Sequence, residues 1–339
     1  GQYHSQSTAF FNASLYSYYR GERYQAYLLG SRYHMKQAEN GGITDDRYLT
    51  NPAQVQGGET KVDAKTIPTN LTKAHSRLVG HNFFMNHRYK VGYYHTWKDS
   101  VNDTIEHREY IPVTSFIWTM DFKTNTHRFL NENIKEDQAF FRDSYLSLSG
   151  TDERTEYTQF TNTLGISLLE GFNKYAKFGL AAYATYEIRK YKQVADSMLY
   201  SANRDANLTP APDFVIPGKN TDNVAWIGGQ LTKQRGSILT YSADARLGVL
   251  GCVAGDVNIS GNITTRIPLF GDSVKISGYG YFRNEEVPYL LQNFVSNHYI
   301  WKNDFGKTRR VRVGGSLVIP HSRTHINVGV ENLQNYVYF

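Results

Sequence analysis

The sequence predicts an all-β fold: an antiparallel up-and-down transmembrane β-barrel with about 14 strands visible, which form part of a larger barrel. Three observations lead to this prediction. Apolar and polar residues alternate in segments along the whole 339-residue chain. No apolar run approaches the roughly 18 residues that a membrane-spanning helix needs. Short and long connections alternate between the predicted strands, as they do in outer-membrane barrels.

Segment 176–191 shows the alternation most clearly. Successive side chains of a strand point to opposite faces of its sheet. One set of alternate positions is apolar: Phe178, Leu180, Ala182, Ala184, Tyr186 and Ile188. The other set is mostly polar or small: Lys177, Gly179, Ala181, Tyr183, Thr185, Glu187 and Arg189. The segment therefore has one face for lipid and one for water, and a lumen lined by the second face implies passage of solutes.

Alternation and turn chemistry together give the strands in order along the chain. The predicted strands are 7–20, 23–37, 75–84, 89–97, 110–122, 126–131, 156–170, 176–191, 222–234, 237–250, 256–268, 273–284, 306–319 and 325–338. Strand 126–131 has the weakest pattern. Aromatic residues lie near many strand ends, where a membrane interface favours rings with one apolar and one wet side.

The connections between these strands fall into two groups. The short ones are 21–22, 85–88, 123–125, 171–175, 235–236, 269–272 and 320–324. The long ones are 38–74, 98–109, 132–155, 192–221 and 285–305, and 251–255 is short where a long one is due. Outer-membrane barrels have tight periplasmic turns and longer extracellular loops. We therefore expect 38–74 and 192–221 to be exposed outside the cell.

Charged residues share one parity in the clearest strands, and this parity predicts the lumen face. A charge on the lipid face costs about 2–4 kcal/mol at mid-bilayer, so the charged face should look inward. The candidate lumen-lining residues are Lys177, Glu187, Arg189, Asp244, Arg246, Lys275, Arg283, Arg310 and Arg312. Because most of them are basic, we expect a weak preference for anions. The alternative is that Glu187 and Asp244 neutralise the wall and leave an unselective pore.

Composition argues against other classes of protein. The formal net charge is +6, but the 37 Lys and Arg residues are scattered and form no basic patch of the kind that binds nucleic acid. Cys252 is the one cysteine of the chain, so no intrachain disulfide or Cys-rich metal site can form. Its glycine neighbours indicate a turn, and we interpret it as a small loop residue.

Few residues carry a signal for chemistry. Gly271–Ser273 has the sequence of a nucleophile motif found in one group of esterases, but Gly-Asp is ordinary turn chemistry. His75 and His81 could share a face of a strand, yet their spacing and that of His321 and His325 fit no metal site. The chain has no phosphate-binding glycine loop and no dinucleotide fingerprint. We therefore expect no catalytic, cofactor-binding or metal-binding residues.

Several segments resemble those of a known family, both in their sequences and in their order along the chain: Ile67–Leu71, His75–Tyr94, Ile111–Phe116, Asn162–Asn173, Lys177–Leu180 and Ile319–Asn332. This pattern is similar to the putative porin family of the Bacteroidetes outer membrane, over about residues 67–339. Members of that family are longer, so the resemblance implies one barrel domain, 1–339, that is incomplete at both ends. The matching segments correspond to turns and barrel strands, and they contain no active-site residue.

We expect a porin of the bacterial outer membrane that conducts small hydrophilic solutes and ions by passive diffusion, without an enzyme activity or a cofactor. Its partners would be outer-membrane lipid and those solutes, with no nucleic acid and with a possible homo-oligomer. The alternative is a barrel that serves as a surface receptor, adhesin or assembly component through its long loops. A lipase-like barrel enzyme is a third class, which the absence of a converging Ser-His pair disfavours.

Overall fold

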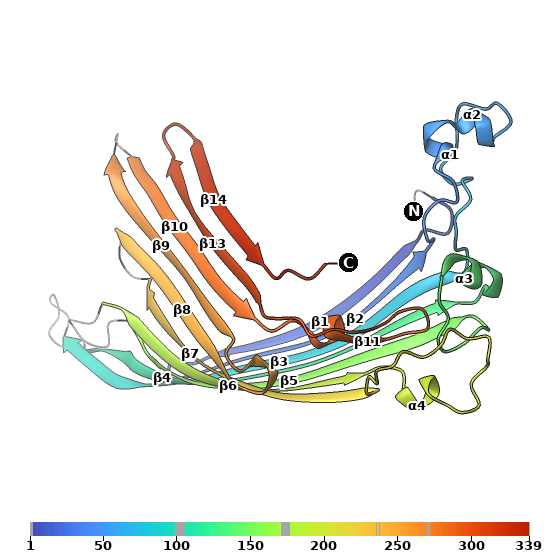
Figure 1. The fold of residues 1–339 in the computed structure, drawn as a ribbon. Helices are drawn as coiled ribbons and strands as arrows, with labels where there is room; N and C mark the ends of the chain where they lie inside the picture. Colours follow the sequence, from blue (N-terminus) through green and yellow to red (C-terminus); the bar gives the residue numbers. More distant parts are fainter. Residues whose placement is uncertain are drawn as a thin grey trace.

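A computed structural model describes residues 3–98, 106–170, 177–234, 236, 238–269 and 272–338. The described chain forms a 12-stranded antiparallel sheet whose strands follow one another in sequence order, with a small two-stranded sheet inserted before the last two. The large sheet curves into a trough, and its edges are β1 and β14 (Figure 1). This is the meander of an up-and-down barrel wall, and the sheet is open along both edges.

The strands of the large sheet are β1 (Thr8–Arg20), β2 (Tyr24–Glu39), β3 (Ala74–Lys98), β4 (Glu106–Asn131), β5 (Thr151–Leu168), β6 (Gly179–Lys192), β7 (Lys219–Lys233), β8 (Leu239–Leu250), β9 (Val257–Leu269), β10 (Asp272–Glu285), β13 (Thr308–Ile319) and β14 (Thr324–Gln334). The small sheet pairs β11 (Asn293–Val295) with β12 (Ile300–Lys302). The helical segments are α1 (Arg47–Thr50), α2 (Pro52–Val55), α3 (Ile134–Phe140), α4 (Asp196–Leu199), the 3-10 turn η1 (Gly251–Val253) and α5 (Tyr289–Gln292). Among the described residues, none of these helices has the length and apolar character needed to cross a membrane.

Two predicted turns are wrong. Residues 85–88 and 123–125 lie inside the long strands β3 and β4, which pair with each other through both positions. Alternation and turn chemistry together predicted that a strand ends at each of these positions. The alternation nevertheless continues through them, because Met85 faces Met120 and His87 faces Trp118 across the strand pair. Cross-strand pairing of these rings and thioethers outweighs the local turn preference. The predicted strands 75–84 and 89–97 are therefore one strand, and so are 110–122 and 126–131.

The connections sort into two ends of the sheet. The longer ones, 40–73, 132–150, 193–218 and 286–307, together with the short 251–256, all join strands at one end, which we call the long-loop end. The tight turns 21–23 and 320–323 lie at the other end, which we call the short-turn end. Because the two internal turns do not exist, β3 ends and β4 begins at the short-turn end. The placement of 98–109 with the long outer loops is therefore wrong.

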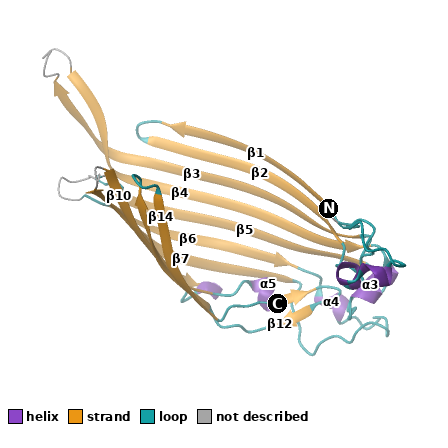
Figure 2. Ribbon diagram, turned by 90° about the horizontal axis from the view of Figure 1, so that it is seen from above, coloured by secondary structure: helices purple, strands orange, loops and turns teal. Residues whose placement is uncertain are grey.

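The strands β3 and β4 extend past their neighbours at the short-turn end (Figure 2). Beyond Val91, β3 pairs only with β4, because β2 begins at Tyr24 and pairs there with Tyr89. A β-bulge at Val91 and Gly92 marks the start of this projecting hairpin. Gly92 is required at the bulge, since a Cβ there would lie 2.0 Å from the carbonyl oxygen of Ile111.

The two faces of the sheet differ in chemistry, as the alternation predicts. On the outer face, Leu164, Ala184, Ile227 and Leu247 are in register from β5 to β8. On the inner face, Arg246, Asn258, Arg283 and Arg310 are in register from β8 to β13. The small strand β11 lies inside the trough (Figure 1), and Asn297 next to it contacts Glu153, a residue with the inner parity of β5. The inner face is therefore the concave, polar one.

Candidate channel-lining face

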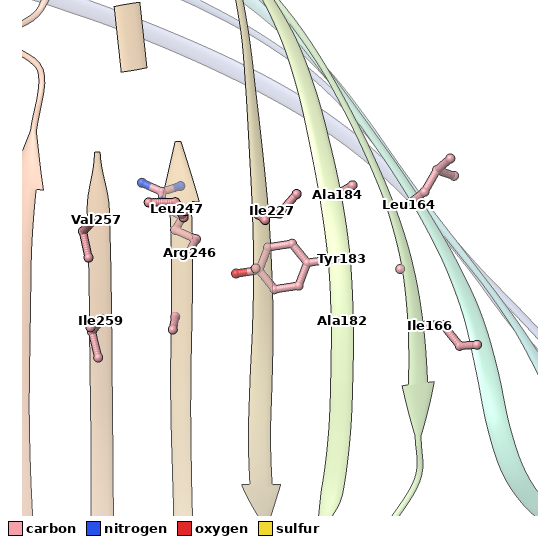
Figure 3. Close-up of a pocket in the computed structure, with 13 residues that line it drawn as sticks. Leu164, Ile166, Ala182, Tyr183, Ala184, Ile227, Arg246, Leu247, Val257 and Ile259 are labelled. Carbon is pink, nitrogen blue, oxygen red and sulfur yellow. The ribbon is translucent and has the colours of Figure 1, made fainter. Parts of the chain in front are cut away.

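The inner face is built from tyrosines that lie flat over glycines of the next strand. Tyr183 reaches from β6 across β7 (Figure 3), and a Cβ on Gly228 would lie 2.4 Å from its ring. Its hydroxyl then donates a hydrogen bond to Asp244 of β8 at 3.1 Å. Glycine is needed at position 228 because the ring occupies the space of a side chain. Each such tyrosine therefore links a strand to the second strand beyond it.

The same device recurs twice more along the sheet. The Tyr33 ring covers Gly80, and its hydroxyl donates to Asn125 on β4. Tyr279 of β10 covers Gly314 of β13 and donates to Asn327 of β14 at 3.1 Å. Aromatic rings that cover glycines in this way fix strand register. They also cover the backbone with flat rings in place of protruding side chains.

Three of the five arginines predicted for the inner face have a carboxylate partner. Glu187 and Arg189 form an ion pair on β6, and Glu187 is only 5% exposed. Arg246 of β8 contacts Glu285 of β10 at 3.3 Å. Arg310 of β13 pairs with Glu331 of β14. These contacts neutralise part of the positive charge of the wall in this region.

Two further arginines of this face contact aromatic rings and have no ion-pair partner among the described residues. Arg283 lies 4.9 Å from the centre of the Tyr281 ring, and Arg312 lies 5.6 Å from that of Tyr279. In the part of the chain that the structure describes, neither arginine forms an ion pair. An aromatic ring attracts a cation without cancelling its charge. Arg283 and Arg312 therefore keep a net positive charge on the wall.

Trp226 anchors the buried part of the same face. Its ring lies below two guanidinium groups, 5.2 Å from that of Arg189 and 5.6 Å from that of Arg246. It packs with Val224 and with Val253 of η1 in a small buried cluster. The connection 251–256 therefore folds back onto the inner face, which explains why a short connection is enough at this position.

The predicted lumen residues divide into those that the fold brings together and those that it does not. Arg246, Arg283, Arg310 and Arg312 lie on neighbouring strands, with Arg283 directly opposite Arg310. Lys275 shares their face but faces Arg266 near the short-turn end. Glu187 and Asp244 line one pocket together with Arg246 and Arg283. Arg189 contacts the Trp226 ring beside Arg246. Lys177 does not join this group. Lys177 is exposed and precedes β6.

Sequence reasoning missed the acidic partners Glu285 and Glu331. Glu331 could have been found, because it has the opposite parity to the apolar Val328 and Val330 within its strand. Glu285 was lost because the predicted strand ended one residue before it. Both errors made the inner face look more basic than it is.

Three long connections meet at the long-loop end, over the inner face. The segment 286–307 leaves β10 and reaches β5, where the Asn297 backbone N–H donates to Glu153 at 2.7 Å. The His298 ring stacks on Phe141 with centroids 3.8 Å apart. Residues of the 193–218 connection join the same cluster, since Arg204 donates to the Tyr145 carbonyl at 2.6 Å. The 286–307 segment therefore crosses part of the mouth of the trough.

A buried polar network holds this crossing segment in place. Asp137 of α3 accepts hydrogen bonds from Asn131 at 2.9 Å and from the Thr151 hydroxyl at 2.9 Å, and it lies 3.3 Å from the His298 ring. Asn297 donates to Thr151 at 2.9 Å. Buried polar groups that satisfy one another in this way fix a single arrangement. The segment is therefore a built part of the inner surface.

The residues considered for chemistry stay apart. Gly271 lies outside the described residues, while Ser273 pairs with Pro268 inside the sheet. His75 and His81 share the outer face of β3, as their spacing allows. Loss of water around the Cys252 thiol, with Asp222 nearby, raises its pKa, so it is a poor nucleophile at neutral pH. No group of three or more potential metal ligands occurs among the residues described.

Comparison with known proteins identifies the family. A family model described as "Putative porin" matches residues 1–339, so the chain belongs to that family and is a β-barrel protein of the outer membrane. A search of curated proteins finds no match. Among solved structures, the chain is similar to the ferric-catecholate import receptor Fiu of E. coli K12 in its open form, with 8% identity and a TM-score of 0.42. That similarity covers 97% of this chain and 58% of the receptor chain.

Proposed function

We propose that the protein is a porin: its barrel forms a water-filled channel through which small hydrophilic solutes and ions diffuse passively. The observation that carries this proposal is the contrast between the two faces of one sheet. Arg246, Arg283 and Arg310 share the concave face, while Leu164 and Ile227 share the convex one. A barrel wall with an apolar convex face and a polar concave face can contact lipid on the outside and water on the inside. Residues 1–339 would then be one part of a larger barrel domain.

We also propose a weak preference for anions. Arg283 and Arg312 supply it, because each contacts an aromatic ring and neither forms an ion pair among the described residues. The ion pairs of Arg189, Arg246 and Arg310 make the preference smaller than the count of basic residues suggests. The segment 286–307 would narrow the passage at the long-loop end, which we place outside the cell. Solutes must then pass beside the packed loops.

Planar-bilayer recording of the full-length protein tests the channel. We expect steady conductance, and swelling of protein-containing liposomes in small sugars. A folded, inserted barrel that conducts nothing and admits no sugar would instead favour a receptor or adhesin that acts through its loops. Conductance that is lowered by polymers narrow enough to enter, and unchanged by larger ones, would give the width of the aqueous pore.

Cysteine labelling tests the two faces in the same protein. In a Cys252→Ser background, a water-soluble maleimide should label cysteines placed at Ala181 and Thr185, and not cysteines placed at Ala182 and Ala184. The pairs are matched, because all four positions lie on β6. Equal labelling of both pairs in membranes would contradict the assignment of an aqueous inner face.

A further inference from the structure

The outer face changes from apolar to cationic toward the long-loop end. The last apolar row across the strands consists of Phe83, Phe122, Phe160 and Ile188, which are in register. Further along the same strands lies a second row, which we call the basic row: Lys36, Arg77, Arg128 and Arg154. All of its members are exposed. The row is continuous over β2, β3, β4 and β5.

The basic row is only partly neutralised within the protein. Arg128 pairs with Asp152 at 2.5 Å, and Arg154 contacts Glu156 at 3.1 Å. Glu156 is shared with a further cation, Lys192 of β6, at 3.2 Å. Within the described part of the chain, Lys36 and Arg77 form no ion pair. Like charges directly opposite each other on neighbouring strands destabilise a sheet. The row therefore has a surplus of positive charge that favours binding of an anion.

The basic row lines two adjoining pockets on the outer face. The larger, of about 620 Å³, is lined by Arg77, Val79, His81, Thr124, Thr126, Arg128, Asp152 and Arg154. The smaller, of about 170 Å³, is lined by His34, Lys36, His75, Arg77 and Arg128. Arg77 and Arg128 belong to both pockets, so the two are contiguous. Guanidinium groups on a rigid sheet bind phosphate oxygens through paired hydrogen bonds.

The position of the basic row fits the headgroup layer of the membrane. Arg77 is six residues from Phe83 along β3, a distance of about 20 Å at the usual rise of a strand. With the tilt of barrel strands, this is about 15 Å along the membrane normal. The row thus lies beyond the hydrocarbon, still on the surface that faces lipid. Basic pockets at this depth bind anionic lipid headgroups.

We propose that the basic row is a binding site for the phosphate groups of an anionic glycolipid in the outer leaflet. The acyl chains of the lipid would lie against the apolar rows below, and its phosphates would contact Arg77, Arg128 and Arg154. The proposal depends on the placement of the long-loop end outside the cell. It does not depend on conduction, because the site lies on the opposite face of the sheet from the channel wall.

Native mass spectrometry of the full-length protein in detergent tests the site. The probe is a bisphosphorylated lipid A-type glycolipid, compared with the same lipid after dephosphorylation and with inorganic phosphate alone. We expect the phosphorylated lipid to bind, and Arg77→Gln with Arg128→Gln and Arg154→Gln to weaken it at least tenfold. Asp152→Asn should strengthen binding, because it removes the carboxylate that neutralises Arg128.

The matched control removes the same charge elsewhere. Lys61→Gln with Lys65→Gln and Lys233→Gln should leave lipid binding unchanged, because these lysines lie in the 40–73 connection and at the short-turn end of β7. Equal loss in this control would overturn the proposal, and so would equal binding of the dephosphorylated lipid. Binding of inorganic phosphate as tight as that of the lipid would show a free-phosphate site instead. Conductance of the arginine variant, measured in parallel, separates this proposal from the channel, since a conducting variant without lipid binding supports both.

Discussion

On the inner face, Arg189, Arg246 and Arg310 each contact a carboxylate of the same chain, whereas on the outer face Lys36 and Arg77 face one another without one. Both groups of cations lie on the same curved sheet. The difference lies in what covers them. Inner cations line the concave side of the sheet, where an unpaired charge would act on any ion that passes. Outer cations lie beside the lipid layer, which can supply its own anions.

The comparison shows that a count of basic residues is a poor guide to the role of a wall. On the inner face, the carboxylates beside Arg189, Arg246 and Arg310 lower the net charge below what the number of arginines suggests. In the outer row, Lys36 and Arg77 have no such partner among the described residues. The charge balance around each group of cations is therefore a better guide than their number.

The largest expected effect comes from breaking a buried inner pair. Glu187→Gln leaves Arg189 without its carboxylate in a site where Glu187 is 5% exposed. Removing one partner of a buried pair costs roughly 3 kcal/mol of stability. We expect the urea midpoint for unfolding in detergent to fall accordingly.

The outer pair Glu156–Arg154 is the control for this prediction. Both side chains are more exposed, so Glu156→Gln should cost less than about 1 kcal/mol. Equal losses for the two variants would show that the inner pair is not in a less hydrated environment than the outer one. The comparison between the faces would then fail.

A second, smaller effect concerns ion selectivity. Glu331→Gln frees Arg310, so it should shift the reversal potential in a salt gradient toward anions. Arg283→Gln with Arg312→Gln removes the uncompensated charges and should shift it toward cations. The shifts should be largest at low salt, where the Debye length exceeds about 10 Å.

Shifts in the same direction, or none at low salt in a conducting channel, would mean that these strands do not line the narrow part of the pore. The exposed variant Lys61→Gln is the control, because its charge lies in the 40–73 connection and away from the inner face.

Much of the fold could be predicted from the sequence, because successive side chains of a barrel strand point alternately to the apolar and to the polar face. The faces of 176–191 follow from parity alone, and β8 begins two residues from the predicted start and ends at Leu250 as predicted. The same reasoning failed at 85–88 and 123–125. The local sequence does not distinguish a polar residue within a long strand from a polar residue in a turn. Only the pairing of β3 with β4 shows that these residues belong to strands.

The candidate site was predictable in outline only. Parity places Arg310 and Arg312 on one face, but it does not reveal that Glu331 from the next strand neutralises Arg310. The contact of Tyr183 with Gly228 depends on strand register, which the alternation leaves open. The packing of His298 against Phe141 joins segments more than 150 residues apart, and no local pattern predicts it.

The smallest expected effect tests the outer row without any ligand. Arg77 has a cation opposite it on each side, Lys36 on β2 and Arg128 on β4. In lipid-free detergent this arrangement is repulsive, so Arg77→Gln should raise stability by about 0.5 kcal/mol. Added salt should raise the stability of the natural protein by a similar amount and have less effect on the variant, because screening removes the same repulsion. Addition of the phosphorylated glycolipid should reverse the order, since bound phosphate stabilises the natural protein and not the variant. Thermal unfolding with and without salt and lipid measures all of these changes. A variant less stable than the natural protein in lipid-free detergent would show that Arg77 already has a partner within the protein, and the contrast between the two faces would be lost.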